Sequence, residues 1–133
     1  MSGSMLAALL LLSARQEAPP PVMEPEMPSW MYIAVFEENS TAMTQGVTYA
    51  LDRVAPWGGR WPDDVWRICG HADADRERDA PRLARRRVRA VIAYLRAHGM
   101  KTTRFTSRQC PPLDPAEAGP RRRVVKLNVM APR

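Results

Sequence analysis

Two charged side chains, Asp73 and Arg87, stand at positions where the sequence predicts contact with a charged ligand. Asp73 ends the run Gly-His-Ala-Asp, directly after an apolar segment typical of a buried strand. Binding groups in open α/β sheets gather in the loops beyond the carboxyl ends of strands. Arg87 follows in the first turns of a predicted helix, where the helix dipole favours an anion. The sequence therefore indicates a polar site between this loop and this helix.

Arg87 differs from the other arginines of its helix. At 100° per residue it falls on the edge of the apolar stripe, near Leu83 and Tyr94. An arginine at the margin of a core loses water and needs a fixed anionic partner. That partner is either the carboxylate of a ligand or a structural carboxylate such as Asp73 or Asp75. Most of the other arginines fall on one flank, which is typical of a solvated face: Arg82, Arg85, Arg89 and Arg96.

The elements that must position this pair alternate between strands and helices. A helix is predicted from Arg82 to His98, ended by Gly99 at a C-cap position. An earlier helix begins after Ser40 or Thr41, and we expect Pro56, Gly58, Gly59 and Pro62 to end it. Four segments have strand character, the last of them half-exposed: Tyr32–Phe36, Val65–Cys69, Arg104–Ser107 and Val124–Val129. The order β-α-β-α-β-β predicts an α/β fold, an open sheet of about four strands with two helices packed on it and parallel pairing across the crossovers.

The N-terminal part of the chain has a different composition from the rest. An apolar run lies within residues 1–14 and has the length of a signal-peptide core, and an apolar tail is the alternative. Arg15 stands where a lipidated cysteine would follow, so this route to a lipid anchor is absent. Residues 15–29 are rich in proline and read as a linker. The folded domain is expected over residues 30–131.

Composition limits the classes of function. The chain has 133 residues, enough for one domain, and a net charge of +6, which favours an anionic partner. A nucleic-acid-binding domain is one alternative, but no RNP motif, helix-turn-helix or zinc site accompanies the arginines, and acids interrupt them. An enzyme is another alternative, since His71, Asp73 and Asp75 could ligate a metal. No catalytic motif is present, so we expect neither catalysis nor a cofactor. For the reasons given above, we also expect no nucleic acid as partner.

The motifs resemble the OmpA-like C-terminal domain family over about 100 residues. That family shows Gly-His-Thr-Asp after a strand, then a helix opening Leu-Ser-x-x-Arg-Ala, then Asn-Arg-Arg-Val before a final strand. This chain has GHAD at 70–73, LARRRV at 83–88 and RRRV at 121–124, in the same order. Upstream, FEENSTAM at 36–43 resembles the family's Phe-x-x-x-Ser. The chain departs from the pattern at Ala72 in place of Thr, and its 71–81 loop lacks the usual glycine.

The resemblance implies non-covalent binding of peptidoglycan in the periplasm, tethering the wall near the outer membrane. In the family the motif Asp takes the ammonium of diaminopimelate and the helix Arg takes a carboxylate, which here implies Asp73 and Arg87. Arg123 matches a further arginine near the same cleft. A carboxylate and a guanidinium fork suit such a zwitterionic head. Cys69 and Cys110 flank the ends of the second and third predicted strands, which neighbour each other in the family, so the two cysteines are expected either to form a disulfide or to remain as two thiols.

A different function on the same fold also stays open. The chain could be a protein-interaction module of the envelope that has lost wall binding. Trp30, Met31, Trp57 and Trp61 could then form an exposed edge for a partner, or they could close the core. The sequence does not indicate an oligomeric state.

Overall fold

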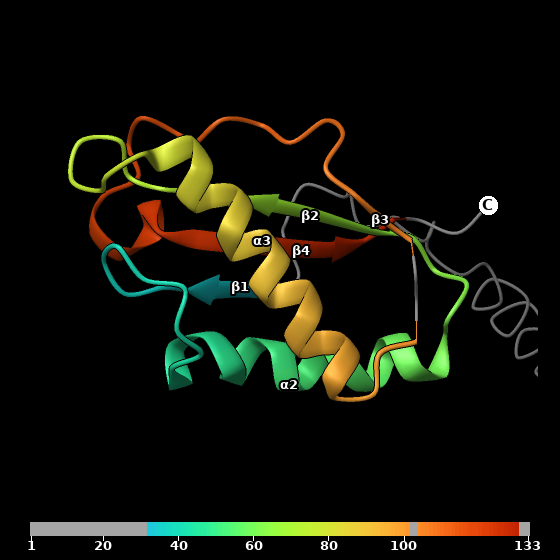
Figure 1. The fold of residues 1–133 in the computed structure, drawn as a ribbon. Helices are drawn as coiled ribbons and strands as arrows, with labels where there is room; N and C mark the ends of the chain where they lie inside the picture. The colour runs from blue at the N-terminus through green and yellow to red at the C-terminus, as the bar shows by residue number, and fades with distance from the viewer. Residues whose placement is uncertain (1–31, 102–103, 131–133) are drawn as a thin grey trace, which may run out of the picture.

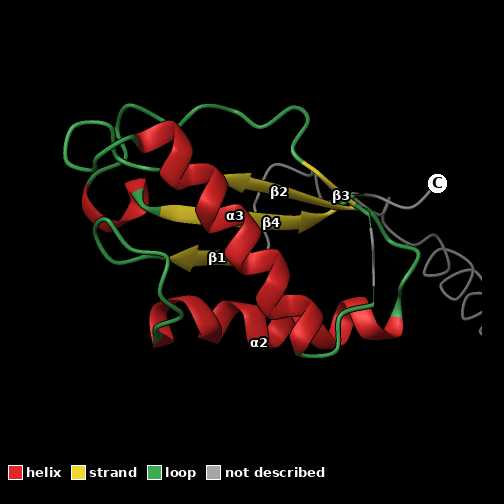
Figure 2. Cartoon of the chain, in the orientation of Figure 1, coloured by secondary structure: helices red, strands yellow, loops and turns green. Residues whose placement is uncertain are grey.

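The sheet that organises the domain has four strands. The computed structural model describes residues 32–101 and 104–130. In chain order its elements are β1 (Tyr32–Val35), α2 (Gln45–Arg60), β2 (Trp66–Gly70), α3 (Ala80–Ala97), β3 (Phe105–Thr106), the 3-10 turn η1 (Gly119–Arg122) and β4 (Val124–Val129). The strand order across the sheet is β1-β4-β2-β3. The predicted α/β architecture with two helices is confirmed (Figures 1 and 2).

The central position of β4 decides the strand directions. β4 pairs antiparallel with both β1 and β2, while β2 and β3 pair in parallel. The expected parallel pairing is therefore found across α3, whereas the crossover through α2 joins two strands that β4 separates. The prediction of a half-exposed final strand is wrong, because Val124 and Asn128 are buried as well as Val125 and Leu127. β4 is an interior strand with β1 on one edge and β2 on the other, which leaves its residues less exposed than those of an edge strand. The buried side chain of Asn128 accepts a hydrogen bond from Arg67 Nε of β2.

Helix α2 runs past three of the four residues that were expected to end it, and it stops before Pro62. Pro56 lies inside the helix, which continues to Arg60. Proline removes only one backbone hydrogen bond there, and the two following glycines allow close packing that compensates for it. A Cβ at Gly58 would lie 2.2 Å from Cγ of Met100, and one at Gly59 would lie 2.7 Å from the carbonyl oxygen of Gly99. The last turn of α2 is thus held against the end of α3.

Helix α3 crosses the sheet and brings its first turns to the carboxyl end of β2 (Figure 1). Its buried positions recur every four residues: Leu83, Arg87, Val91 and Leu95. Arg87 therefore lies in the middle of the buried stripe and is 0% exposed, which corrects its expected place on the stripe's edge. Gly70 permits this approach, because a Cβ there would lie 2.6 Å from both the carbonyl oxygen of Ala84 and Cγ2 of Val88.

The hydrophobic core lies between the two helices and the face of the sheet that they cover. Its largest side chains include Phe36, Leu51, Trp66, Ile68 and Leu95. No helix in the described part of the chain is both long and apolar enough to span a membrane. The segments 1–14 and 15–29, together with Trp30 and Met31, lie outside the described residues.

Candidate ligand-binding site

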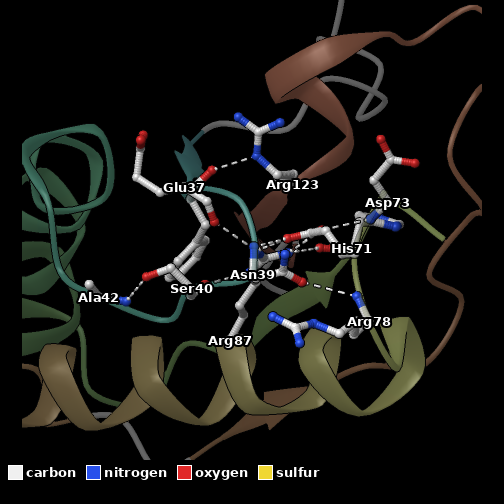
Figure 3. A network of polar contacts seen from close by, with 11 residues as sticks. Glu37, Asn39, Ser40, Ala42, His71, Asp73, Arg78, Arg87 and Arg123 are labelled. Carbon is white, nitrogen blue, oxygen red and sulfur yellow. Dashed lines mark hydrogen bonds and ion pairs between the residues drawn. The ribbon is translucent and has the colours of Figure 1, made fainter. Parts of the chain in front are cut away.

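Four segments meet at one end of the sheet and build a polar cluster (Figure 3). They are the loop after β1, the loop after β2, the second turn of α3, and η1 before β4. Arg87 reaches from α3 into the space between the two loops. The cluster therefore lies beyond the carboxyl end of β2, where the sequence placed the site.

The guanidinium of Arg87 uses all five of its N–H donors. Nε donates to the carbonyl oxygen of Ser40 at 3.0 Å, and Nη2 donates to that of Glu37 at 3.0 Å. Nη1 donates to the carbonyl oxygen of His71 at 3.2 Å. The remaining two donors bind both oxygens of Glu77, with Nη1 at 2.9 Å from Oε1 and Nη2 bonded to Oε2. A buried charge with every donor satisfied holds both loops against the helix.

Glu77 is the buried counterion of Arg87. Its two oxygens also accept from backbone N–H groups, Oε1 from Asp73 and Oε2 from Asn39, both at 2.8 Å. Burial by itself raises the pKa of this carboxyl, but the hydrogen bonds from Arg87, Asp73 and Asn39 outweigh it and the pKa falls below the ordinary value. Glu77 is therefore ionised throughout the neutral range.

Asp73 is buried in the same cluster but does not pair with Arg87. Its Oδ1 accepts from Arg122 Nε at 3.1 Å and from the backbone N–H of Asp75 at 3.1 Å. In Figure 3 its carboxylate points away from the Arg87 guanidinium. The Asp73 side chain is 4% exposed and that of Arg122 is 24% exposed. This ion pair thus lies at the rim of the cluster, between the loop after β2 and η1.

Arg123 braces the site from its other side. Its Nε donates to the carbonyl oxygen of Phe36 at 3.0 Å, and its own carbonyl accepts from Phe36 N–H at 2.8 Å. The Phe36 ring lies beneath the Arg87 guanidinium, with Cζ 5.2 Å from the ring centroid. Arg123 thus contacts the cluster through the backbone of Phe36, while the neighbouring Arg122 contacts Asp73.

His71 contributes its backbone carbonyl to the cluster and keeps its ring half-buried. Burial lowers the pKa of the imidazole, and the positive charge of Lys126 lowers it further. The ring is accordingly neutral at pH 7. In the ranges 32–101 and 104–130 no group of three or more His, Cys, Asp or Glu side chains is arranged to hold a metal, so His71, Asp73 and Asp75 do not form such a group.

Sequence reasoning missed three residues of the cluster: Glu77, Arg122 and Asn39. Glu77 is one of several acids in an irregular loop, and no periodicity predicts which of them turns inward. Among the consecutive arginines 121–123, the 3-10 turn decides which side chain faces Asp73. The backbone of Asn39 has a φ of 54°, a left-handed conformation that asparagine tolerates better than most residues. An asparagine in the loop sequence ENS was therefore a signal that a tight turn could occur there.

A disulfide fastens the segment that leads to η1. Cys69 at the end of β2 is bonded to Cys110, with a Cα–Cα distance of 5.7 Å. Ser107 adds a hydrogen bond from its hydroxyl to the carbonyl oxygen of Ile68 at 2.9 Å. Because Arg122 follows this segment, the two links limit how far η1 can move from β2.

Comparison with known proteins gives a likeness of fold. No protein-family model and no curated protein sequence matches the chain. Among solved structures, the peptidoglycan-associated lipoprotein from Burkholderia pseudomallei superposes with a TM-score of 0.60 at 18% sequence identity. The match covers 84% of this chain and 100% of that one. The chain therefore shares its fold, a four-stranded mixed sheet with two helices, with an OmpA-like peptidoglycan-associated lipoprotein.

Proposed function

We propose that this chain binds peptidoglycan non-covalently in the bacterial cell envelope and tethers the wall through the diaminopimelate of the stem peptide. The observation that carries the proposal is the burial of Asp73 and Arg87 in one polar cluster at the end of β2. The shared fold with a peptidoglycan-associated lipoprotein supports it. A periplasmic location fits the disulfide between Cys69 and Cys110, since such bonds persist in oxidising compartments.

Each half of a zwitterionic amino-acid head has a counterpart in the cluster. Asp73 is an acceptor for the ligand's ammonium, and the planar fork of Arg87, which holds the Glu77 carboxylate in this structure, has the shape that binds the ligand's carboxylate. Arg123 acts through Phe36, by holding the ring on which the Arg87 guanidinium rests. This mode of binding needs no bond making or breaking, and we propose a binding protein, not an enzyme.

Co-sedimentation of the purified full chain with insoluble peptidoglycan sacculi tests this function. We expect the wild type in the pellet and Asp73→Ala and Arg87→Met in the supernatant. Matched controls are Asp75→Ala, an exposed acid of the same loop, and Arg89→Ala, an exposed arginine of the same helix. Both controls change the charge as much as the site variants do and should sediment like the wild type.

Circular dichroism and a thermal melt on each variant separate lost binding from lost folding. A folded wild type that stays in the supernatant refutes the proposed function. If the wild type and all four variants sediment equally, the chain binds sacculi through a surface other than this cluster.

An interaction module is the second candidate, and exposed aromatic side chains favour it. Trp57 is 37% exposed and Trp61 is 50% exposed at the end of α2, away from the polar cluster. Large apolar side chains gathered on a surface often mark a partner site. If the wild type ignores sacculi, cross-linking in envelope extracts with and without Trp61→Ala is the next experiment, and an adduct that disappears in the variant supports this candidate.

A further inference from the structure

We infer that Glu77 and Arg122 occupy the two charge positions that the ligand's carboxylate and ammonium take, so that the site is closed by an internal mimic of its ligand. Glu77 is the decisive residue, because a ligand carboxylate reaches Arg87 only when Glu77 leaves. The inference rests on the proposed function for the identity of the ligand. The carboxylate position itself can be tested without peptidoglycan.

The cradle around Glu77 is a complete carboxylate site. Four donors converge on its two oxygens: Nη1 and Nη2 of Arg87 and the backbone N–H groups of Asp73 and Asn39. None of these donors recognises anything of Glu77 beyond its carboxylate. Any carboxylate on a narrow stem can make the same four bonds, including the one on an amino-acid head.

Arg87 has no donor left for a second anion. The three donors not bonded to Glu77 bind the carbonyl oxygens of Glu37, Ser40 and His71. Those carbonyls belong to the loops that shape the site, so releasing them would take the site apart. A ligand carboxylate therefore replaces Glu77 and cannot be added beside it.

Replacement keeps the buried charges balanced. Removing one partner of a buried ion pair is strongly destabilising because the other charge is left unpaired. When one carboxylate takes the place of another, Arg87 is never left alone in the interior. The same holds at the rim, where an ammonium would take the place of Arg122 beside Asp73.

For a ligand carboxylate to replace Glu77, the loop that carries Glu77 must move outward. Glu77 lies in the loop 71–79, held by a turn in which its N–H donates to the carbonyl oxygen of Asp73 at 2.7 Å. The loop is also fastened to Asn39, whose Oδ1 accepts from Arg78 N–H at 3.0 Å, to Arg87 through the carbonyl oxygen of His71, and to Arg122 through Asp73. Outside it lies a polar hollow of about 340 Å³ with Arg78, Arg82 and Arg86 in its lining. A released Glu77 would meet this positive surface instead of an apolar one.

Acetate is the probe for the emptied cradle, used with the full chain, Glu77→Ala and Glu77→Ala/Arg87→Met. We expect Glu77→Ala to bind acetate in an NMR titration or a thermal-shift series against chloride, with an affinity about ten-fold or more above that of the wild type. The double variant lacks the guanidinium and, with an apolar pair in its place, should fold without binding acetate. If Glu77→Ala unfolds in chloride, acetate should restore its folding. A folded Glu77→Ala that ignores acetate, or an unfolded one that acetate does not rescue, overturns the inference.

Sacculi then separate this inference from the proposed function. Glu77→Ala should bind sacculi about ten-fold or more tightly than the wild type, since the internal competitor is gone. Equal binding by the two proteins overturns the inference and leaves the proposed function standing. Acetate binding by Glu77→Ala with no sacculi binding by either protein supports the carboxylate cradle and refutes the proposed function.

Discussion

The Glu77 carboxylate and the Arg87 guanidinium meet fork to fork in the interior, and neither side chain is exposed to solvent. Glu77 comes from an irregular loop, whereas Arg87 comes from the middle of a helix's buried stripe. Their pairing is thus what joins the loop after β2 to α3. The loop after β1 is joined to the same pair through Asn39, Ser40 and Glu37. The cluster and the elements that hold it lead to five predictions.

Arg87→Ala should lower the free energy of unfolding by about 3–5 kcal/mol, because Glu77 is left as an uncompensated buried charge. Glu77→Leu/Arg87→Met should lose much less, since an apolar pair of similar volume leaves no charge behind. Urea unfolding followed by circular dichroism measures both, with exposed Arg86→Ala as the matched control. A double variant as unstable as the single one would show that the cluster holds the loops through the carbonyl contacts alone.

Acid should weaken the fold through Glu77. Its folded-state pKa lies below the ordinary value, so its stabilising contribution is fully present above the unfolded pKa of about 4.3 and is lost as the pH falls through the folded pKa. We expect the free energy of unfolding of the wild type to fall below about pH 5. Above that pH, the free energy of unfolding of Glu77→Gln should lie below that of the wild type by a constant amount. Below that pH, the difference in free energy between the two proteins should narrow. A constant difference down to pH 2 would mean that Glu77 does not titrate in this way.

His71 adds a separate acid dependence that the Glu77→Gln comparison leaves in place. Its pKa is lowered by burial and by Lys126, so the unfolded chain binds the proton more readily than the folded one. Stability should therefore decline as the pH falls below about 6.5, the unfolded pKa of histidine. His71→Asn should remove this first decline and keep the one below pH 5. Unfolding in urea at pH steps from 8 to 3 resolves the two.

Much of the fold was predictable because it depends on local patterns. The apolar periodicity of α3 and the strand character of 32–36 and 124–129 identified the α/β order, and the run GHAD pointed to the end of β2, where the polar cluster lies. The position of Arg87 was predicted less well. Its angle on a helical wheel placed it at the edge of the apolar stripe of the helix, but a helical wheel cannot show that a buried carboxylate will pair with it. Helix α2 was predicted too short, because the contact of Gly58 with Met100 is made by a residue 42 positions away. Glu77 and Arg122 were missed because irregular loops and a 3-10 turn decide which of several like charges faces inward.

Gly70→Ala should separate α3 from β2 and destabilise the domain by about 1–3 kcal/mol. The added Cβ meets a backbone oxygen, that of Ala84, as well as Cγ2 of Val88. Trimming the side chain in Gly70→Ala/Val88→Ala should therefore fail to restore stability, because the backbone contact remains. Thermal unfolding of the single and double variants measures this. Full restoration in the double variant, after allowing for Val88→Ala alone, would show that the side-chain contact dominates.

Reduction of the disulfide should loosen the segment before η1 more than it disturbs the sheet. Closing a loop between residues 41 apart stabilises a fold by about 4 kcal/mol in the chain-entropy treatment. We therefore expect Cys69→Ser/Cys110→Ser to unfold at a clearly lower urea concentration than the wild type. Its amide exchange should rise most at residues 107–122, because Arg122 loses its restraint to β2 while β1 and β4 stay paired. Thiol titration of the unfolded wild type under non-reducing conditions is the control. Two reactive thiols there, or equal stability of the two proteins, would contradict a structural role for the bond.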